Sequence, residues 1–209
     1  MNSYREILHK LSVFTAKYYT RLLIKGVLLF LLFGILLFIG IVSLEYFLWM
    51  GTSGRLILFL LLVGAIAFIG VKYIVTPVFY LFKLKKGIST KEASLLIGRH
   101  FPEIGDRLFN LLELAEDTNK SELLLASIEQ RSNNLQPFTF ANAIRLKDGL
   151  RSAKYLVAPI VILGILWASG NLKSFFGSYE RVVNYDMAYL PPAPFKFVLL
   201  NRTMNALES

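Results

Sequence analysis

Three long runs without a charged residue dominate this sequence. They cover residues 27–44, 56–71 and 155–172, and hold 18, 16 and 18 residues. A helix needs about 20 apolar residues to cross a bilayer core of roughly 30 Å, because each residue rises 1.5 Å. Three buried core helices would leave too little polar sequence in a chain of 209 residues to cover them. We therefore expect three membrane-spanning helices.

The first two runs predict an antiparallel transmembrane hairpin over residues 26–82. Glu45 interrupts the apolar sequence near the end of the first span, and Gly51-Thr52-Ser53-Gly54 follows it. Two glycines and two small hydroxyl residues are typical of a turn. Lys72 interrupts the second span, and we interpret it as a side chain that extends to the membrane–water interface. Pro77 predicts a kink or an end of the second helix.

The basic residues are placed unevenly around the spans. The chain holds 23 Lys+Arg and 14 Asp+Glu, a formal charge of +9. Bases gather before the first span, after the second and before the third, whereas the hairpin loop carries only Arg55. The positive-inside rule then predicts that the N-terminus and the middle segment lie in the cytoplasm, and that the hairpin loop and the C-terminus lie on the other side of the membrane. Charges in the middle segment nearly balance, so nucleic acid is not an expected partner.

Residues 1–25 predict an amphipathic helix that lies on the cytoplasmic membrane surface. Ile7, Leu11, Phe14 and Tyr18 recur at helical spacing, with bases between them. This interfacial helix would lead directly into the first span.

Residues 83–154 predict a small helical insert in the cytoplasm. Ser89 and Glu92 have the spacing of a capping box, so a helix should begin there and stop before Pro102. A second helix is expected over 104–116, and a third from Ser121 to Pro137. A fourth should begin near residue 141 and continue unbroken into the third span, 155–172. A core of this size is marginal alone, so we expect it to dock on the membrane or on a partner.

Residues 173–209 predict a periplasmic tail. A proline-rich link at 191–194 precedes a partly alternating segment at 195–200, which looks like a first β-strand. The predicted fold class is therefore an all-α membrane protein with three transmembrane helices, a helical cytoplasmic insert between spans 2 and 3, and the start of a periplasmic β region.

Few residues in this chain suggest catalysis. There is no cysteine, which excludes disulfides and thiol chemistry, and neither His9 nor His100 has a second histidine at helical spacing for a metal pair. The common nucleotide-binding and hydrolase motifs do not occur. We therefore expect no enzymatic activity and no cofactor. A membrane enzyme remains an open, less favoured hypothesis, using His100 with the neighbouring acidic residues Glu103, Asp106, Glu113, Glu116 and Asp117.

One stretch of the sequence resembles a known family. Residues 87–114 read GISTKEASLLIGRHFPEIGDRLFNLLEL, which is similar to the "EAA…IG.HFPE..D.L.N.L.L" stretch of large uncharacterised inner-membrane proteins of Bacteroidota. The resemblance spans nearly the whole chain, but only the N-terminal part of the family. It implies that the family's β-rich periplasmic region would start near Ser209. Family genes often lie near those for MoxR-type AAA+ ATPases, which implies a role in the cell envelope.

These observations favour a non-enzymatic anchor or scaffold subunit of a cell-envelope complex. Its expected partners are the lipid bilayer and other envelope proteins, with a MoxR-type AAA+ ATPase as one candidate. The charged residues at the centre of the family-like stretch are the candidate partner-binding residues: Arg99, His100, Glu103, Asp106 and Arg107. The alternative is a transport or channel accessory subunit that uses Lys72 and Glu45, the two ionisable residues closest to the spans.

Overall fold

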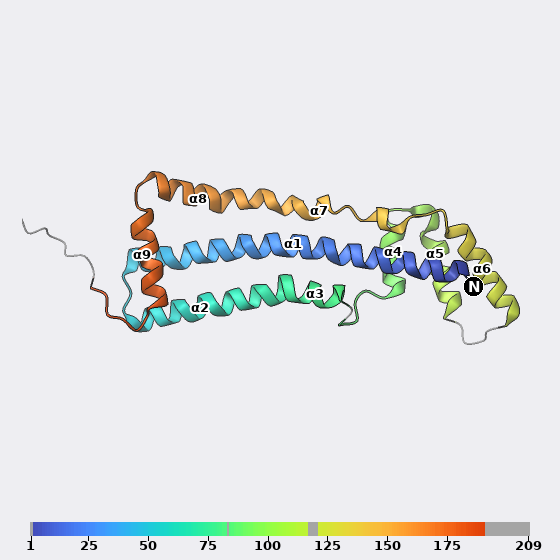
Figure 1. The fold of residues 1–209 in the computed structure, drawn as a ribbon, viewed down its shortest axis with the longest axis horizontal. Coiled ribbons are helices and arrows are strands. Elements are labelled where there is room, and N and C mark those ends of the chain that lie inside the picture. Colours follow the sequence, from blue (N-terminus) through green and yellow to red (C-terminus); the bar gives the residue numbers. More distant parts are fainter. Residues whose placement is uncertain (1, 83, 117–120, 191–209) are drawn as a thin grey trace, which may run out of the picture.

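The computed structural model describes residues 2–82, 84–116 and 121–190, and within them the chain forms helices joined by short loops, with no strand. Three helical stretches are long and apolar enough to cross a membrane: Asn2–Leu48, Thr52–Leu81 and Phe140–Ala168. Figure 1 shows α1 running between the other two along the length of the molecule. The prediction of three membrane-spanning helices in an all-α protein is therefore confirmed at this level.

Helix α1 (Asn2–Leu48) is a single unbroken helix of 47 residues. At 1.5 Å per residue it is about 70 Å long, roughly twice what a bilayer core requires. Its second half lies beside the other long helices. Its first half extends past them into a separate packed unit (Figure 1).

That unit is built from α4 (Thr90–Gly98), α5 (Pro102–Ala115) and α6 (Glu122–Leu135). The predicted capping box is confirmed: the Ser89 hydroxyl accepts a bond from the Glu92 N–H, and the Glu92 carboxylate accepts one from the Ser89 N–H. Ser121 caps α6 in the same way by accepting from the Leu124 N–H. Local hydrogen-bonding chemistry therefore sets both helix starts, as the sequence indicates.

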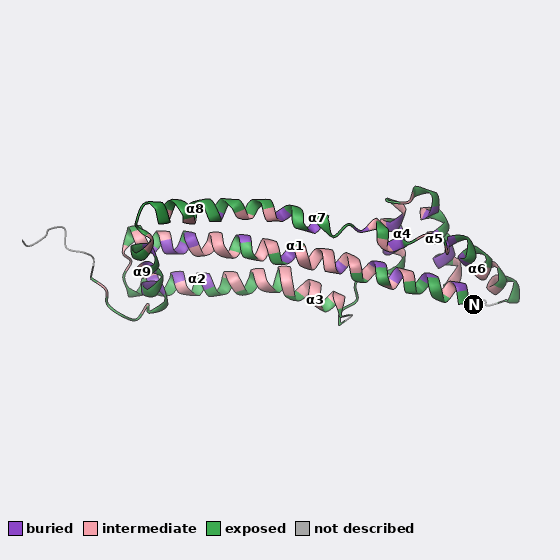
Figure 2. Ribbon diagram, turned by 45° about the horizontal axis from the view of Figure 1, so that its top comes forward, coloured by how far each residue is buried: buried purple, intermediate pink, exposed green. Residues whose placement is uncertain are grey.

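The first half of α1 forms the centre of this unit, so the prediction of an interfacial helix over 1–25 is wrong. Ile7, Leu11 and Phe14 are buried in one core with side chains of α4, α5 and α6. Figure 2 shows buried positions on this part of α1 and on α4 and α5. A stripe of apolar residues at helical spacing fits a membrane surface and a protein partner equally well. The three short helices expose apolar faces that they cannot bury among themselves, and α1 covers them.

Polar contacts hold α1 in this position. The Ser3 N–H donates to Glu129 Oε1 on α6 at 3.0 Å. Lys10 donates to the carbonyl of Gln136, and Lys17 donates to the carbonyl of Ala141 at 2.8 Å. The two lysines thus bond to carbonyl groups in the segment that follows α6 and join it to α1.

The second long stretch contains α2 (Thr52–Gly70), a π-helical segment (Val71–Val75) and α3 (Thr76–Leu81). Pro77 has no N–H to bond the carbonyl of Tyr73, and the helix widens at this point without ending. The Tyr73 carbonyl lies directly against the Cα of Gly26 on α1. The predicted kink is thus a widened turn that packs closely on a glycine.

The third long stretch is less regular than predicted. A 3-10 turn (Phe140–Ala143), the short α7 (Lys147–Leu150) and a 3-10 segment (Arg151–Leu156) precede α8 (Val157–Ala168). The expectation of one unbroken helix from residue 141 is therefore wrong. Ile144 is extended, and the Cβ position of Gly149 lies 3.0 Å from the Arg21 carbonyl, so this part of the chain follows the surface of α1.

After α8 the chain turns at Gly170 and forms α9 (Leu172–Val183), which crosses the end of the bundle (Figure 1). Apolar side chains of α9 pack on both α1 and α2. Val182 meets Ile41 and Leu58, whereas Phe175 meets Ile39 and Val42. The sequence analysis assigns no helix to the tail predicted from residue 173, whereas the structure forms α9 over 172–183. The proline-rich link and the predicted strand at 195–200 lie outside the described residues.

The Gly26–Tyr73 contact predicts that Gly26→Ala destabilises the protein. The added methyl group would overlap the Tyr73 carbonyl oxygen, and such overpacking costs about 1–3 kcal/mol. Gly34→Ala is the matched control on the same helix, because a Cβ there meets nothing within 4 Å. It should be neutral or stabilise by up to about 1 kcal/mol, as alanine favours helix. Unfolding of both variants in detergent measures the difference, and equal stabilities would contradict the close packing.

The Ser3–Glu129 contact predicts a pH dependence. The hydrogen bond from the Ser3 N–H lowers the pKa of Glu129 from 4.5 to about 2. A lowered pKa in the folded state means that the contact stabilises the unit fully above about pH 4.5 and loses this effect as the pH falls toward 2. Glu129→Gln should remove this part of the pH dependence of unfolding, whereas Glu122→Gln on the same helix should keep it. Identical acid profiles for the two variants would contradict this role.

Candidate functional site

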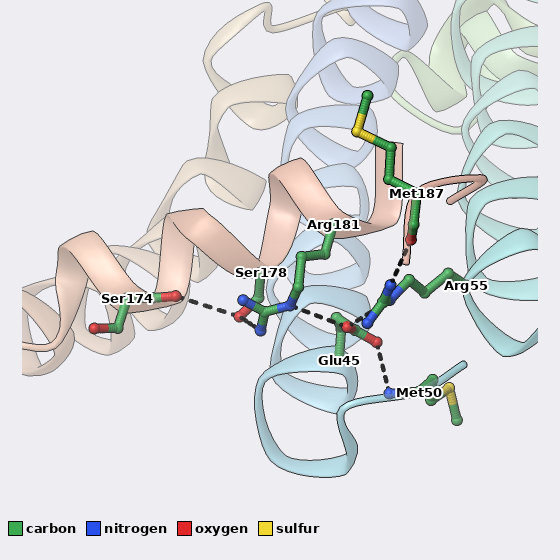
Figure 3. Close-up of polar contacts among 7 residues, drawn as sticks. All are labelled: Glu45, Met50, Arg55, Ser174, Ser178, Arg181 and Met187. Atoms are coloured by element: carbon green, nitrogen blue, oxygen red, sulfur yellow. Dashed lines mark hydrogen bonds and ion pairs between the residues drawn. The ribbon is translucent and has the colours of Figure 1, made fainter. Parts of the chain in front are cut away.

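Three charged residues meet where α9 crosses the ends of α1 and α2. Glu45 lies in the last turn of α1, Arg55 in the first turn of α2, and Arg181 in the last turn of α9. The chain reverses between Glu45 and Arg55 through a tight turn, in which Trp49 adopts a left-handed conformation with φ of 43°. Two residues close in sequence and one far away are thus brought to a single point (Figure 3).

The Glu45 carboxylate is the centre of this cluster. Arg55 Nε donates to its Oε1 at 2.9 Å, and Arg181 Nε donates to the same oxygen at 3.1 Å. The second oxygen, Oε2, accepts from the Met50 N–H at 3.2 Å, within the turn that joins the two helices. Both carboxylate oxygens therefore have partners.

The two guanidinium groups have further partners. Arg55 donates to the Met187 carbonyl at 3.1 Å, and Arg181 donates to the Ser178 hydroxyl at 2.8 Å. Aromatic rings lie against both cations: the Trp49 centroid is 3.9 Å from the Arg181 guanidinium carbon, and the Tyr189 ring is 5.0 Å from that of Arg55. These contacts pair charge with hydrogen bonds and π faces, as buried arginines require.

The cluster is buried although it lies at the end of an apolar bundle. Glu45 is 0% exposed, Arg55 2% and Arg181 8%. Removing three charges from water carries a large desolvation cost, which only close geometry and satisfied hydrogen bonds offset. One carboxylate faces two guanidinium groups, so the three side chains carry a formal charge of +1. We conclude that the cluster fastens α9 and the segment up to Met187 onto the hairpin.

The chemistry of this cluster is structural. Both oxygens of the Glu45 carboxylate are occupied by hydrogen-bond donors, two guanidinium groups and a backbone N–H. Within residues 2–82, 84–116 and 121–190, no group of three or more His, Asp or Glu side chains is placed to hold a metal ion. The arrangement is therefore suited to holding helices together.

The five predicted partner-binding residues lie at the opposite end of the molecule. All five are exposed, around the α4–α5 turn and along the outer face of α5: Arg99, His100, Glu103, Asp106 and Arg107. In the structure these five residues do not form one cluster. Arg99 and His100 border a hollow of about 220 Å³ against Tyr18 and Arg21 of α1, whereas Arg107 faces Arg131 of α6. Among the described residues, no ion pair links these five to one another.

Close packing of two glycines sets the geometry of this end. A Cβ on Gly98 of α4 would lie 2.8 Å from the Cα of Gly105 of α5, so the two helices cross almost in backbone contact. The crossing presents the turn at 99–102 outward. The predicted residues thus lie on a rigid, exposed corner, and their role in binding stays a prediction.

Lys72 and Glu45, the two residues of the transport alternative, are not neighbours. Glu45 bonds to Arg55, and Lys72 follows Arg55 by 17 positions along the same helical stretch. This separation corresponds to about 25 Å at 1.5 Å per residue. Lys72 is exposed, with its Nζ 5.6 Å from the Tyr73 ring centroid. The two groups therefore do not form one polar path through the bundle.

The sequence contained part of this site. Glu45 and Arg55 are isolated opposite charges separated by ten positions across a predicted turn. That pattern is a detectable signal for an ion pair. Arg181 carries no such signal, because its partner lies 136 positions away.

No family model matches the chain, and neither the curated proteins nor the solved structures gave a match. The resemblance of residues 87–114 to the Bacteroidota membrane proteins therefore stays a prediction from sequence.

The cluster predicts that Glu45→Gln loosens α9. The amide leaves two buried guanidinium groups without a counter-charge, and breaking one partner of a buried ion pair costs about 3–5 kcal/mol. Amide hydrogen exchange over 172–187 should speed up markedly in this variant. Glu180→Gln is the matched control, because Glu180 is exposed on the same helix. Unchanged protection of α9 in Glu45→Gln would contradict its fastening role.

Proposed function

We propose that this chain is a non-enzymatic anchor and scaffold subunit of a cell-envelope complex in a bacterial inner membrane. In this proposal the α4–α6 unit lies in the cytoplasm, and α9 with the residues after it lies in the periplasm. The unbroken α1 is the observation that carries it. One helix forms the core of the packed unit at one end and bears Glu45 of the buried cluster at the other.

A scaffold must hold binding surfaces at fixed positions, and α1 is suited to this. A continuous helix keeps all its backbone hydrogen bonds internal, so it crosses the apolar layer without an exposed polar group. At about 70 Å it also extends well beyond that layer on the side of α4–α6. A partner bound to the α4–α6 unit and one bound near α9 would then be held by the same rigid element.

The charge distribution supports the proposed sidedness. Lysines and arginines are frequent near the α4–α6 end of each span, and the short α1–α2 turn carries Arg55 alone. The Arg55 side chain is moreover buried and paired with Glu45, so the surface of that turn carries still less positive charge. This asymmetry favours a cytoplasmic α4–α6 unit.

The exposed corner at 99–107 is the proposed contact for a cytosolic partner, and an AAA+ ATPase of the MoxR type is the candidate that the sequence resemblance implies. The corner combines two arginines and two acids with a histidine on a rigid helix crossing. Exposed charges of this kind affect the selectivity and the rate of association with a partner more than the affinity. We expect a partner that recognises a mixed-charge helical corner.

Purification from native membranes tests the proposal. The tagged chain should bring down partners in stoichiometric amounts, and Arg107→Glu should reduce recovery of a cytosolic partner roughly fivefold or more by charge repulsion. Arg5→Glu is the matched control, since Arg5 is an exposed arginine at the same end of the molecule but outside the corner. Recovery of a solitary chain, or equal losses in both variants, would contradict the scaffold role.

A further inference from the structure

A groove opens where the α1–α3 pair leaves the apolar part of the bundle. Two adjoining hollows of about 400 and 450 Å³ share Tyr19 of α1, Tyr80 of α3 and residues 86–88 of the following loop. Tyr19 stacks on Tyr80 with ring centroids 5.2 Å apart and forms the floor between the two hollows. Figure 1 shows this loop passing from α3 back toward α1 and α4.

The groove lies at the level of lipid headgroups. Gly26 faces Tyr73 across the hairpin, and the first uncharged run of α1 begins at the next residue, Val27. Tyr19 and Tyr80 lie about two turns further toward the α4–α6 unit. The groove therefore begins where the hydrocarbon layer ends, whichever side of the membrane this is.

Three lysines line the groove, and none of them has a counter-ion within the part of the chain that the structure describes. Lys72 comes from the π-helical segment, and Lys85 and Lys86 come from the loop after α3. All three are exposed, and none forms an ion pair among the described residues. Glu92 is the one acidic residue among the lining residues, and its carboxylate is engaged by the Ser89 N–H at 2.7 Å. The lining therefore carries a net charge of +3 − 1 = +2.

The remaining lining is of two kinds. Tyr80 and Thr76 contribute hydroxyl groups to the hollow that Lys72 and Lys86 line, whereas Leu22 and Pro77 form its apolar wall on the side of the spans. An occupant that satisfies both must carry an anion next to hydrocarbon. Ammonium groups bind phosphate as point charges, and basic pockets between spans are suited to anionic headgroups.

We propose that this groove binds an anionic phospholipid, with the phosphate held between Lys72 and Lys86 and the glycerol and upper acyl chains against Leu22 and Pro77, toward the spans. A soluble phosphate would gain only the lysines and leave the apolar wall wet. A neutral lipid would leave the positive charge unmatched. Because Lys72 belongs to the second span and Lys86 to the start of the α4–α6 segment, the lipid would join the hairpin to the packed unit. The proposal does not depend on the scaffold function.

The test measures lipid preference of the purified full chain. In nanodiscs that contain phosphatidylglycerol or cardiolipin in a phosphatidylcholine background, native mass spectrometry counts the lipids retained when the protein is released. The wild type should retain an anionic lipid selectively. Lys72→Gln with Lys86→Gln should reduce this selectivity by about fivefold for each lysine removed.

Lys25→Gln with Lys154→Gln is the matched control. Both of these lysines are exposed near the same membrane boundary but do not line the groove, and the variant has the same change of net charge. Selectivity that survives in this control and falls in the Lys72/Lys86 variant supports the site. An equal fall in both variants, retention of neutral lipid by the wild type, or no selectivity at all would overturn it. Helicity by circular dichroism confirms that each variant is folded.

Discussion

Helix α1 is unbroken over 47 residues, and this continuity determines how the other helices are arranged. In a bilayer core every N–H and C=O must bond within the helix, so a span cannot be interrupted without cost. Here the same helix continues past the apolar layer and becomes the centre of the α4–α6 unit. The three short helices need Ile7, Leu11 and Phe14 to complete their core. The continuous helix α1 therefore fixes the position of α4, α5 and α6 relative to the membrane.

The other end of α1 is fixed by charge. Between apolar helices in lipid, contact with a neighbouring helix has little advantage over contact with acyl chains, so apolar packing alone does not select one arrangement. Glu45 supplies the missing selectivity because it has one geometry in which both oxygens are bonded, and this geometry requires Arg55 and Arg181 together. The desolvation cost of three buried charges favours this single arrangement over alternatives that leave one of them unpaired.

Features set by local chemistry could be predicted from the sequence. The lengths of the apolar runs give the spans, and Ser89, Glu92 and Ser121 give the starts of α4 and α6, because each depends on neighbours within three residues. The predictions fail where contacts between distant parts of the chain determine the structure. The amphipathic stripe of residues 1–25 fits lipid or protein, and only the presence of α4–α6 selects between them. Residues 172–183 form a helix because their apolar face packs on α1 and α2.

The candidate site likewise has a part that local sequence predicts and a part that depends on distant contacts. Glu45 and Arg55 are near neighbours in sequence, and their pairing follows from the turn between them, whereas Arg181 is brought to them by the path of α8 and α9. Pro77 marks the disturbance in the second span from sequence alone. The widened turn that results is defined by Gly26 on the other helix, which no local pattern reveals.

Single-cysteine labelling can establish on which side of the membrane each end of α1 lies, because the chain has no cysteine of its own. We propose that α1 holds the α4–α6 unit and the α9 end on opposite sides of one membrane. Ser174→Cys on α9 and Gln130→Cys on α6 each introduce one thiol into the chain. With a membrane-impermeant maleimide on intact spheroplasts, we predict labelling at 174 at once and at 130 only after the membrane is opened. Labelling of both positions from the same side would contradict the account.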